Sequence, residues 1–289
     1  MKALFLIVLA IAIFGTGAYF TYELLIVPKL ALKAEKELPP PPPPPDPTVP
    51  EFEAAKAVLK TGKLLESREA LSAFVERYPE SSKMDEAKDL LGKINTDLFL
   101  STRPAPEKEV YIVKGGDVIT RVAAKLKVPP ELLMRANNLD GTMLRIGQKL
   151  TVAPADFSVV ISRKRDKVTL NNKGRFFKQY PVLAWPPQHA KKVLPPGQKA
   201  PPLVKQAGKV REKVAYLDGN RVIFTEKGFW SAKFWVEISI SGCTLYPKPR
   251  EGEPETPNSK PINGGIALDP DAMTEIGALL SKDDPVILE

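Results

Sequence analysis

The sequence predicts a multi-domain α+β fold, and three observations support this prediction. An uncharged apolar run opens the chain, apolar residues recur at helical spacing over 51–100, and short β-type segments fill residues 156–289. Between the helical and β-rich parts, residues 106–155 follow the pattern strand, helix, helix, strand. We therefore expect five parts, with the boundaries 1–28, 29–50, 51–100, 106–155 and 156–289.

Composition narrows the chemistry that the chain can perform. Among its 289 residues there is one cysteine, Cys243, and one histidine, His189. A single cysteine excludes an intramolecular disulfide framework, and no cysteine/histidine cluster suggests a metal. We predict neither a metal nor a cofactor. The scarcity of histidine also limits general-base catalysis, because histidine is the commonest base near neutral pH.

The N-terminal run "ALFLIVLAIAIFGTGAYFTY" (3–22) carries no charge and is long enough to cross a bilayer as a helix. A cleaved signal peptide with "GTGA" (15–18) as its cleavage site is an alternative, and a buried core helix is another. We favour a retained transmembrane anchor over 1–28, since the apolar run resumes at Leu24–Val27. Seven consecutive prolines at 39–45 then predict a semi-rigid polyproline spacer within 29–50.

Residues 51–100 predict helices with one apolar face each. Leu64, Leu71 and Phe74 share the first face, Pro79 ends that helix, and Ser82 opens the next one. Over about 45 residues this pattern resembles a tetratricopeptide-type helical hairpin. A lone hairpin buries little apolar surface, so it should pack on another part of the chain. The resemblance implies an envelope protein as a partner, whereas a plain helical connector is the alternative.

The segment "YIVKGGDVITRVAAKLKVPPELLMRANNLDGTMLRIGQKLTV" (111–152) predicts strand-helix-helix-strand, with a turn at 115–117 that caps the first helix. It resembles the LysM domain over its full length, in the Gly-Asp turn, the Asn before the second loop and the Leu-x-x-Gly-Gln-x-Leu ending (144–150). That resemblance implies a shallow groove for N-acetylglucosamine-containing glycan, that is, peptidoglycan. The groove residues carried over are Gly116, Asp117, Val118 and Ile119, with Asn138, Leu139, Leu144 and Ile146 opposite.

Residues 156–289 predict a mainly-β sandwich or barrel with one late helix that begins at Pro270. The first three strands and the C-terminal end resemble the catalytic domain of L,D-transpeptidases, cysteine enzymes of peptidoglycan cross-linking. In that family the end reads Ser-His-Gly-Cys-Ile-Arg-Leu. Here "INGGIAL" (262–268) occupies the motif, so Asn263 replaces the histidine and Gly265 replaces the nucleophile. A glycine cannot form a thioester.

A second register places the motif on "ISGCTL" (240–245), with Cys243 as the nucleophile. Ser241 then stands in the histidine position, so this register has no base unless His189 folds back from its proline-rich loop. An ordinary half-buried strand residue is the alternative interpretation of Cys243. We therefore predict no catalytic residue, with Cys243 as the minority candidate.

Together these features predict a peptidoglycan-binding protein of the cell membrane, single-pass, with the bulk of the chain on the extracytoplasmic (periplasmic) side. Lys29, Lys33 and Lys36 follow the apolar run, so the positive-inside rule alone would place the C-terminal part of the chain in the cytoplasm. The domains predicted after the run favour export, and we give them more weight. The basic stretch 157–250 has no nucleic-acid motif, and we expect the partners to be wall glycan and the lipid bilayer. An active or divergent L,D-transpeptidase and a structural spacer that recruits an envelope protein remain alternatives.

Overall fold

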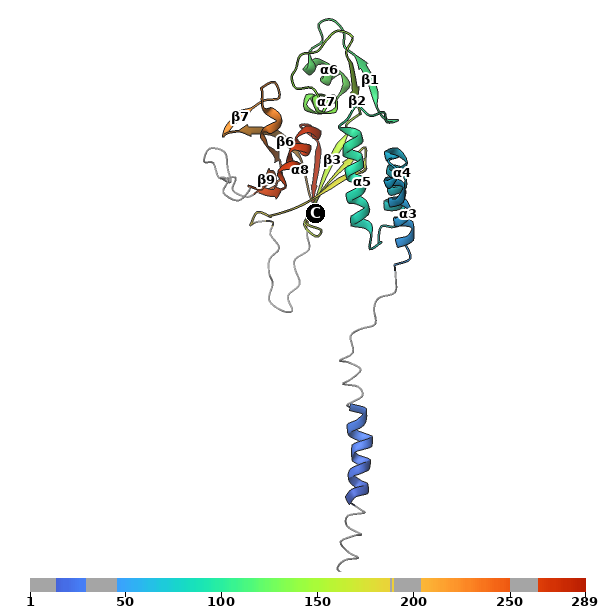
Figure 1. Cartoon of the computed structure of the whole chain (residues 1–289). Helices are drawn as coiled ribbons and strands as arrows, with labels where there is room; N and C mark the ends of the chain where they lie inside the picture. Colours follow the sequence, from blue (N-terminus) through green and yellow to red (C-terminus); the bar gives the residue numbers. More distant parts are fainter. Residues whose placement is uncertain (1–13, 30–45, 188, 190–203, 250–264) are drawn as a thin grey trace, which may run out of the picture. The chain divides into compact units, whose positions relative to one another are not determined.

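The computed structural model describes residues 14–29, 46–187, 189, 204–249 and 265–289, and it divides into two compact units, 1–46 and 47–289 (Figure 1). In the first unit, residues 14–29 are helical and include a π-helical turn, Tyr22–Ile26. Among the described residues, no helix has the length and apolarity needed to cross a membrane. The predicted span 3–22 lies partly outside the described residues, so the anchor stays a prediction.

The second unit begins with three helices, α3 (Val49–Lys60), α4 (Leu64–Arg77) and α5 (Met84–Phe99). The sequence predicted a hairpin of two, and α3 is the addition. It packs on α4 because Phe52 is fully buried there, with its ring 5.5 Å from that of Phe74. The predicted Ser82 cap is wrong: α5 begins at Met84 with Lys83 at its N-cap position and no side-chain capping bond.

Helix α5 packs directly on strand β5 (Arg175–Pro181), as the expectation of a packing partner required. The helix and strand approach closely at Gly92, where an added Cβ would lie 2.8 Å from Cγ of Lys178. Asn95 Nδ2 donates to the carbonyl oxygen of Phe177 over 2.8 Å, and Gln179 Nε2 donates to Asp89 Oδ1 over 2.8 Å. The helical part is therefore bound to the β-rich part by side-chain and backbone groups.

The next module has the predicted strand-helix-helix-strand order: β1 (Glu109–Ile112), α6 (Ile119–Leu126), α7 (Pro130–Ala136) and β2 (Lys149–Val152) (Figure 1). Strands β1 and β2 pair antiparallel. Pro130 lies in the first turn of α7, where its missing N–H costs nothing.

The C-terminal part is a mixed sheet in the order β10-β9-β8-β6-β11-β3-β4-β5, with β7 paired to β6. Its strands are β3 (Phe157–Ser162), β4 (Lys167–Asn172), β5, β6 (Gln206–Leu217), β7 (Asn220–Val222), β8 (Lys233–Ile238), β9 (Thr244–Pro247), β10 (Gly265–Leu268) and β11 (Pro285–Leu288). The chain just after β5 bonds to β10, with Ala267 N donating to Ala184 O over 2.9 Å. Both ends of the sheet are thereby joined.

The late helix α8 (Pro270–Leu279) begins as predicted, because Asp269 accepts a hydrogen bond from the backbone N–H of Asp271. It packs on β8 and β9, and Gly277 allows this approach since an added Cβ would lie 2.5 Å from Phe234. One buried apolar cluster includes residues of the strand-helix-helix-strand module, of α8 and of the sheet. The 47–289 unit therefore has a core that continues across the predicted boundary at 155.

Candidate functional site

The turn after β1 is closed by Asp117. Its Oδ2 accepts the backbone N–H of Lys114 over 2.8 Å and the hydroxyl of Tyr111 over 2.8 Å, and these two bonds hold the pKa of Asp117 below its usual value. The N-cap of α6 is Val118, without a side-chain capping bond. The prediction that this turn caps the helix is therefore corrected: Asp117 fixes the turn itself, and Gly116 provides its positive φ of 83°.

An open depression of about 600 Å³ lies on the loop between α7 and β2. Three of the residues predicted for glycan binding line it: Asn138, Leu139 and Ile146. The first turn lies beside it, because a Cβ on Gly115 would be 3.8 Å from Cδ1 of Ile146. The sequence did not predict glycan binding for the other lining residues, which are Asp140, Gly141, Met143, Arg145, Gly147 and Gln148.

The residues predicted for glycan binding differ in how far their side chains are exposed to solvent. Ile146 is 79% exposed and Val118 is 48% exposed, so both side chains are accessible to a ligand. Leu139 and Leu144 are half-buried, and Asn138 is exposed with φ at 50°. Ile119 is 2% exposed and belongs to the core, so its side chain does not reach the surface. Apolar surface next to exposed backbone suits a sugar ring with an acetamido group.

A second cluster of chemistry-bearing residues surrounds Cys243, in the connection between β8 and β9. Cys243 is fully buried, and its Sγ lies 3.5 Å from Nε2 of His189. The same nitrogen lies 2.7 Å from the backbone oxygen of Ser241. His189 thus folds back onto Cys243 from 54 residues upstream, which is the condition that the second register required.

The protonation of His189 and Cys243 does not favour an activated thiol. A carbonyl oxygen can only accept, so Nε2 of His189 carries a hydrogen and donates it to Ser241. While it does so, Nε2 cannot take the proton of Cys243. Burial raises the pKa of the Cys243 thiol to about 11, and the nearby Arg163 offsets this only in part. At pH 7 about one molecule in ten thousand holds a thiolate.

The first register of the motif lies on the neighbouring strand. Strands β9 and β10 are parallel, and Gly265 is paired with Thr244, the residue after Cys243. A Cβ at Gly265 would lie 2.6 Å from the ring of Tyr246 and 2.7 Å from the backbone oxygen of Thr244. Side-chain chemistry at 265 is therefore excluded by space as well as by residue type. Asn263, the other substituted position, lies outside the described residues.

Comparison with known proteins identifies one part of the chain by sequence. Residues 111–153 match the family model of the LysM domain, so this module is a LysM domain, as its sequence predicted. A search of the curated proteins finds no match to this chain.

Among solved structures, similar chains include an L,D-transpeptidase from Mycobacterium smegmatis, at 14% identity and a TM-score of 0.29. The match covers 50% of this chain and 64% of that chain. An L,D-transpeptidase mutant from Enterococcus faecium is 13% identical, with a TM-score of 0.28 and coverage of 70% and 83%. A fused Zn-dependent amidase/peptidase/peptidoglycan-binding domain-containing protein from Clostridium acetobutylicum is 12% identical, with a TM-score of 0.30 and coverage of 46% and 52%. TM-scores this low support no inference from the chemistry of those proteins to this chain.

Proposed function

We propose that this chain binds peptidoglycan through its LysM domain and that its C-terminal sheet acts as a scaffold without transpeptidase activity. The observation that carries the proposal is the LysM match at 111–153, together with the open depression next to the 115–117 turn. Exposed Val118 and Ile146 supply apolar contact for a sugar face, and the adjoining turns supply backbone donors and acceptors.

Co-sedimentation of the purified full-length chain with peptidoglycan sacculi, in a non-ionic detergent, tests the binding. Gly116→Trp should reduce binding at least tenfold, because a bulky side chain would cover the depression from the first turn. Gly62→Trp is the matched control: Gly62 has a similar φ of 77°, has the same open space around it, and lies in the remote turn between α3 and α4. Equal loss in both variants, or no loss in either, contradicts the proposed groove.

A second candidate function is thiol chemistry at Cys243, and the 3.5 Å contact with His189 is the observation that favours it. An active L,D-transpeptidase would need Nε2 to release Ser241 and accept the thiol proton. Wild type and Cys243→Ala should be compared for turnover of tetrapeptide muropeptides and for a β-lactam adduct by intact mass. We expect neither protein to react. Reaction of wild type alone would establish the enzyme and refute the scaffold role.

We propose in addition that residues 3–22 anchor the chain in the cell membrane with residues 29–289 on the extracytoplasmic side. The uncharged run and the wall-directed LysM domain support this topology. A reporter that is active only after export, fused behind Glu289, should be active, and the protein should fractionate with membranes. A soluble mature form that starts near Ala18 would refute the retained anchor.

A further inference from the structure

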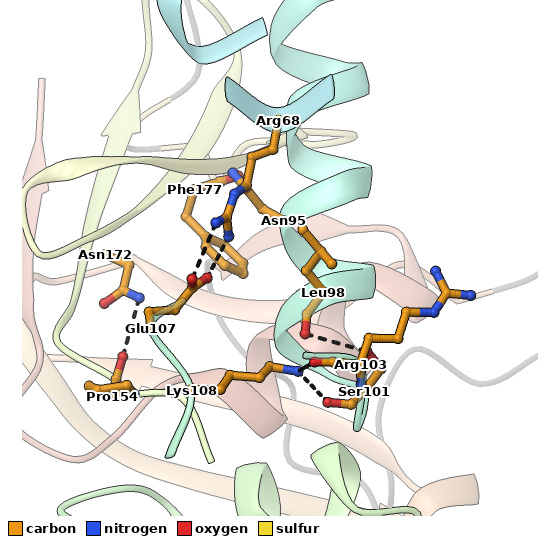
Figure 2. Close-up of polar contacts among 10 residues, drawn as sticks. All are labelled: Arg68, Asn95, Leu98, Ser101, Arg103, Glu107, Lys108, Pro154, Asn172 and Phe177. Atoms are coloured by element: carbon orange, nitrogen blue, oxygen red, sulfur yellow. Dashed lines mark hydrogen bonds and ion pairs between the residues drawn. The ribbon is translucent and has the colours of Figure 1, made fainter. Parts of the chain in front are cut away.

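A polar cleft of about 550 Å³ lies outside both sites described above, where helices α4 and α5 meet the β4–β5 hairpin and the segment that leads into the LysM domain. Figure 2 shows the contacts that surround it. Its volume falls within the range of about 300–1,000 Å³ that is usual for small-ligand sites. Four separate stretches of the chain contribute to its walls, so the cleft exists only in the folded unit.

The base of the cleft is apolar and well packed. Phe99 and Phe177 are both buried, and their rings meet edge to face with centroids 5.3 Å apart. Phe176 also lines the cleft and is half-buried. Asn95 Nδ2 bonds to the backbone oxygen of Phe177 (Figure 2). The aromatic base is therefore fixed before any ligand arrives.

One wall is fixed by a bidentate ion pair. The guanidinium of Arg68, on α4, donates to both carboxylate oxygens of Glu107, with Nη2 to Oε2 at 3.2 Å (Figure 2). Next to it, Lys108 Nζ donates to the backbone oxygens of Ser101 and Arg103. These contacts tie the 101–108 segment to the helices and satisfy the charges of Arg68 and Glu107, so a ligand would have to be recognised by other groups.

Three charged lining residues have no ion pair or side-chain hydrogen bond within the described part of the chain: Glu69, Glu76 and Arg175. Glu69 and Glu76 lie seven residues apart on α4 and so share one helical face, separated by about 10 Å along the axis. Arg175, the first residue of β5, also lines the cleft. The site thus offers two free carboxylates, one free guanidinium and an apolar base.

We propose that this cleft binds a short peptide that carries a free ammonium group and a free carboxylate, specifically the peptide stem of peptidoglycan, and this assignment rests on the proposed wall-binding function. One of the two α4 carboxylates, Glu69 or Glu76, would receive the ammonium, and Arg175 would pair with the carboxylate. Two unpaired carboxylates against one guanidinium disfavour a polyanion such as a teichoic acid or a lipid headgroup.

Calorimetric titration of the full-length chain with a soluble, glycan-free tetrapeptide stem that contains a diamino acid tests the proposal. Wild type should bind, and Glu69→Gln/Glu76→Gln and Arg175→Gln should each weaken binding at least tenfold. Acetylation of the free side-chain amine of the peptide should weaken binding to wild type by a similar factor, and it should add nothing to the loss in the Glu69→Gln/Glu76→Gln variant. Absence of binding to wild type overturns the proposal, and so does equal binding by all variants.

Three controls distinguish a loss of binding at this cleft from a folding defect and from an effect on the proposed glycan site. Glu66→Gln removes a carboxylate from the same helix, but Glu66 is paired with Lys63 and does not line the cleft, so stem binding should be unchanged. The cleft variants replace exposed groups without partners and should keep the unfolding temperature of wild type. Gly116→Trp should lose sacculus binding and keep stem binding. If wild type binds the stem peptide but not sacculi, the glycan proposal alone is refuted; if wild type binds sacculi but not the stem peptide, this cleft alone is refuted.

Discussion

Two positions that carry the transpeptidase-like motif differ in what their surroundings allow. Cys243 has a thiol and a histidine neighbour, but burial and the tautomer of His189 keep the thiol protonated. Gly265 has no room for any side chain. The residue type at 265 was readable from the sequence, but the contact of His189 with Cys243 was not, because the two positions are 54 residues apart and strands β6 to β8 lie between them in the chain.

Substitution of Gly265 by alanine should destabilise the chain by about 1–3 kcal/mol, since the new Cβ would contact the Tyr246 ring and a backbone oxygen that cannot move away. Urea denaturation followed by tryptophan fluorescence measures this loss. Gly141→Ala is the control: no atom lies within 4 Å of the added Cβ, so its stability should stay within about 0.5 kcal/mol of wild type. Equal stability of the two variants would show that β9 and β10 can separate at this point.

The carboxyl of Asp284 should make stability depend on pH in the mildly acidic range. Burial raises its pKa to about 6, against the hydrogen bond from Ser281 N and the charge of Lys213. An acid with a raised folded-state pKa contributes stability at low pH and loses it as pH rises through that pKa. Stability should therefore fall between about pH 4 and pH 6.

A shift of two pKa units corresponds to about 3 kcal/mol, and partial exposure of the carboxyl reduces this to about 1–2 kcal/mol. Asp284→Asn can still accept the bond from Ser281 and should remove this part of the pH dependence. Chemical denaturation of both proteins at pH 4, 5, 6 and 7 measures it. Parallel pH profiles for wild type and Asp284→Asn would refute the assignment.

At the scale of elements, local patterns predicted most of the regular structure. The LysM order, strands β3 to β5, helix α8 and strand β11 follow from periodicity, turn residues and the Asp269-Pro270 start. The sequence did not predict α3 as a separate helix, because its few apolar residues are recognisable as a buried face only once α4 packs on them. The extension of β6 back to Gln206 was also missed, since its first residues are exposed and are held by pairing to β11.

One such element boundary depends on Asn137. Its Nδ2 donates to Leu133 O and Thr151 O, both over 2.8 Å, and its Oδ1 accepts Thr151 N over 2.7 Å. The side chain thereby joins the end of α7 to β2. Asn137→Ala should cost about 2–3 kcal/mol, because it leaves backbone groups of Thr151 without partners. Asn138→Ala removes the neighbouring exposed side chain and should cost less than half as much. Hydrogen exchange at Thr151 N–H reports the effect directly, and unchanged protection there contradicts it.

At the scale of the whole 47–289 unit, the LysM domain is part of a common core and not a separately tethered module. Helix α7 contacts α8, and the guanidinium of Arg135 lies 5.5 Å from the Trp230 ring centroid. Lys213, on β6, has a side chain that is only 14% exposed; its Nζ lies 3.5 Å from Glu131 Oε1 on α7 and donates to Gly277 O over 2.9 Å. A largely buried pair across the predicted boundary at 155 fixes the orientation of the LysM domain relative to the sheet. No local sequence pattern predicts such a pair, since both residues look like ordinary surface charges.

Removal of one member of this pair should therefore destabilise both sides of the boundary together. Glu131→Gln removes the ion-pair partner of the Lys213 ammonium, a loss that costs about 3–5 kcal/mol in a fully buried pair. The Gly277 carbonyl and the remaining exposure of both side chains lower the expected loss to about 2–3 kcal/mol. Amides of β2 in the LysM domain and of β6 in the sheet should lose hydrogen-exchange protection by the same factor. The double variant Glu131→Leu/Lys213→Met, in which no buried charge remains, should recover most of the loss. If only the LysM amides lose protection, the domain is an independent folding unit, and a fragment limited to 105–155 then suffices for glycan binding.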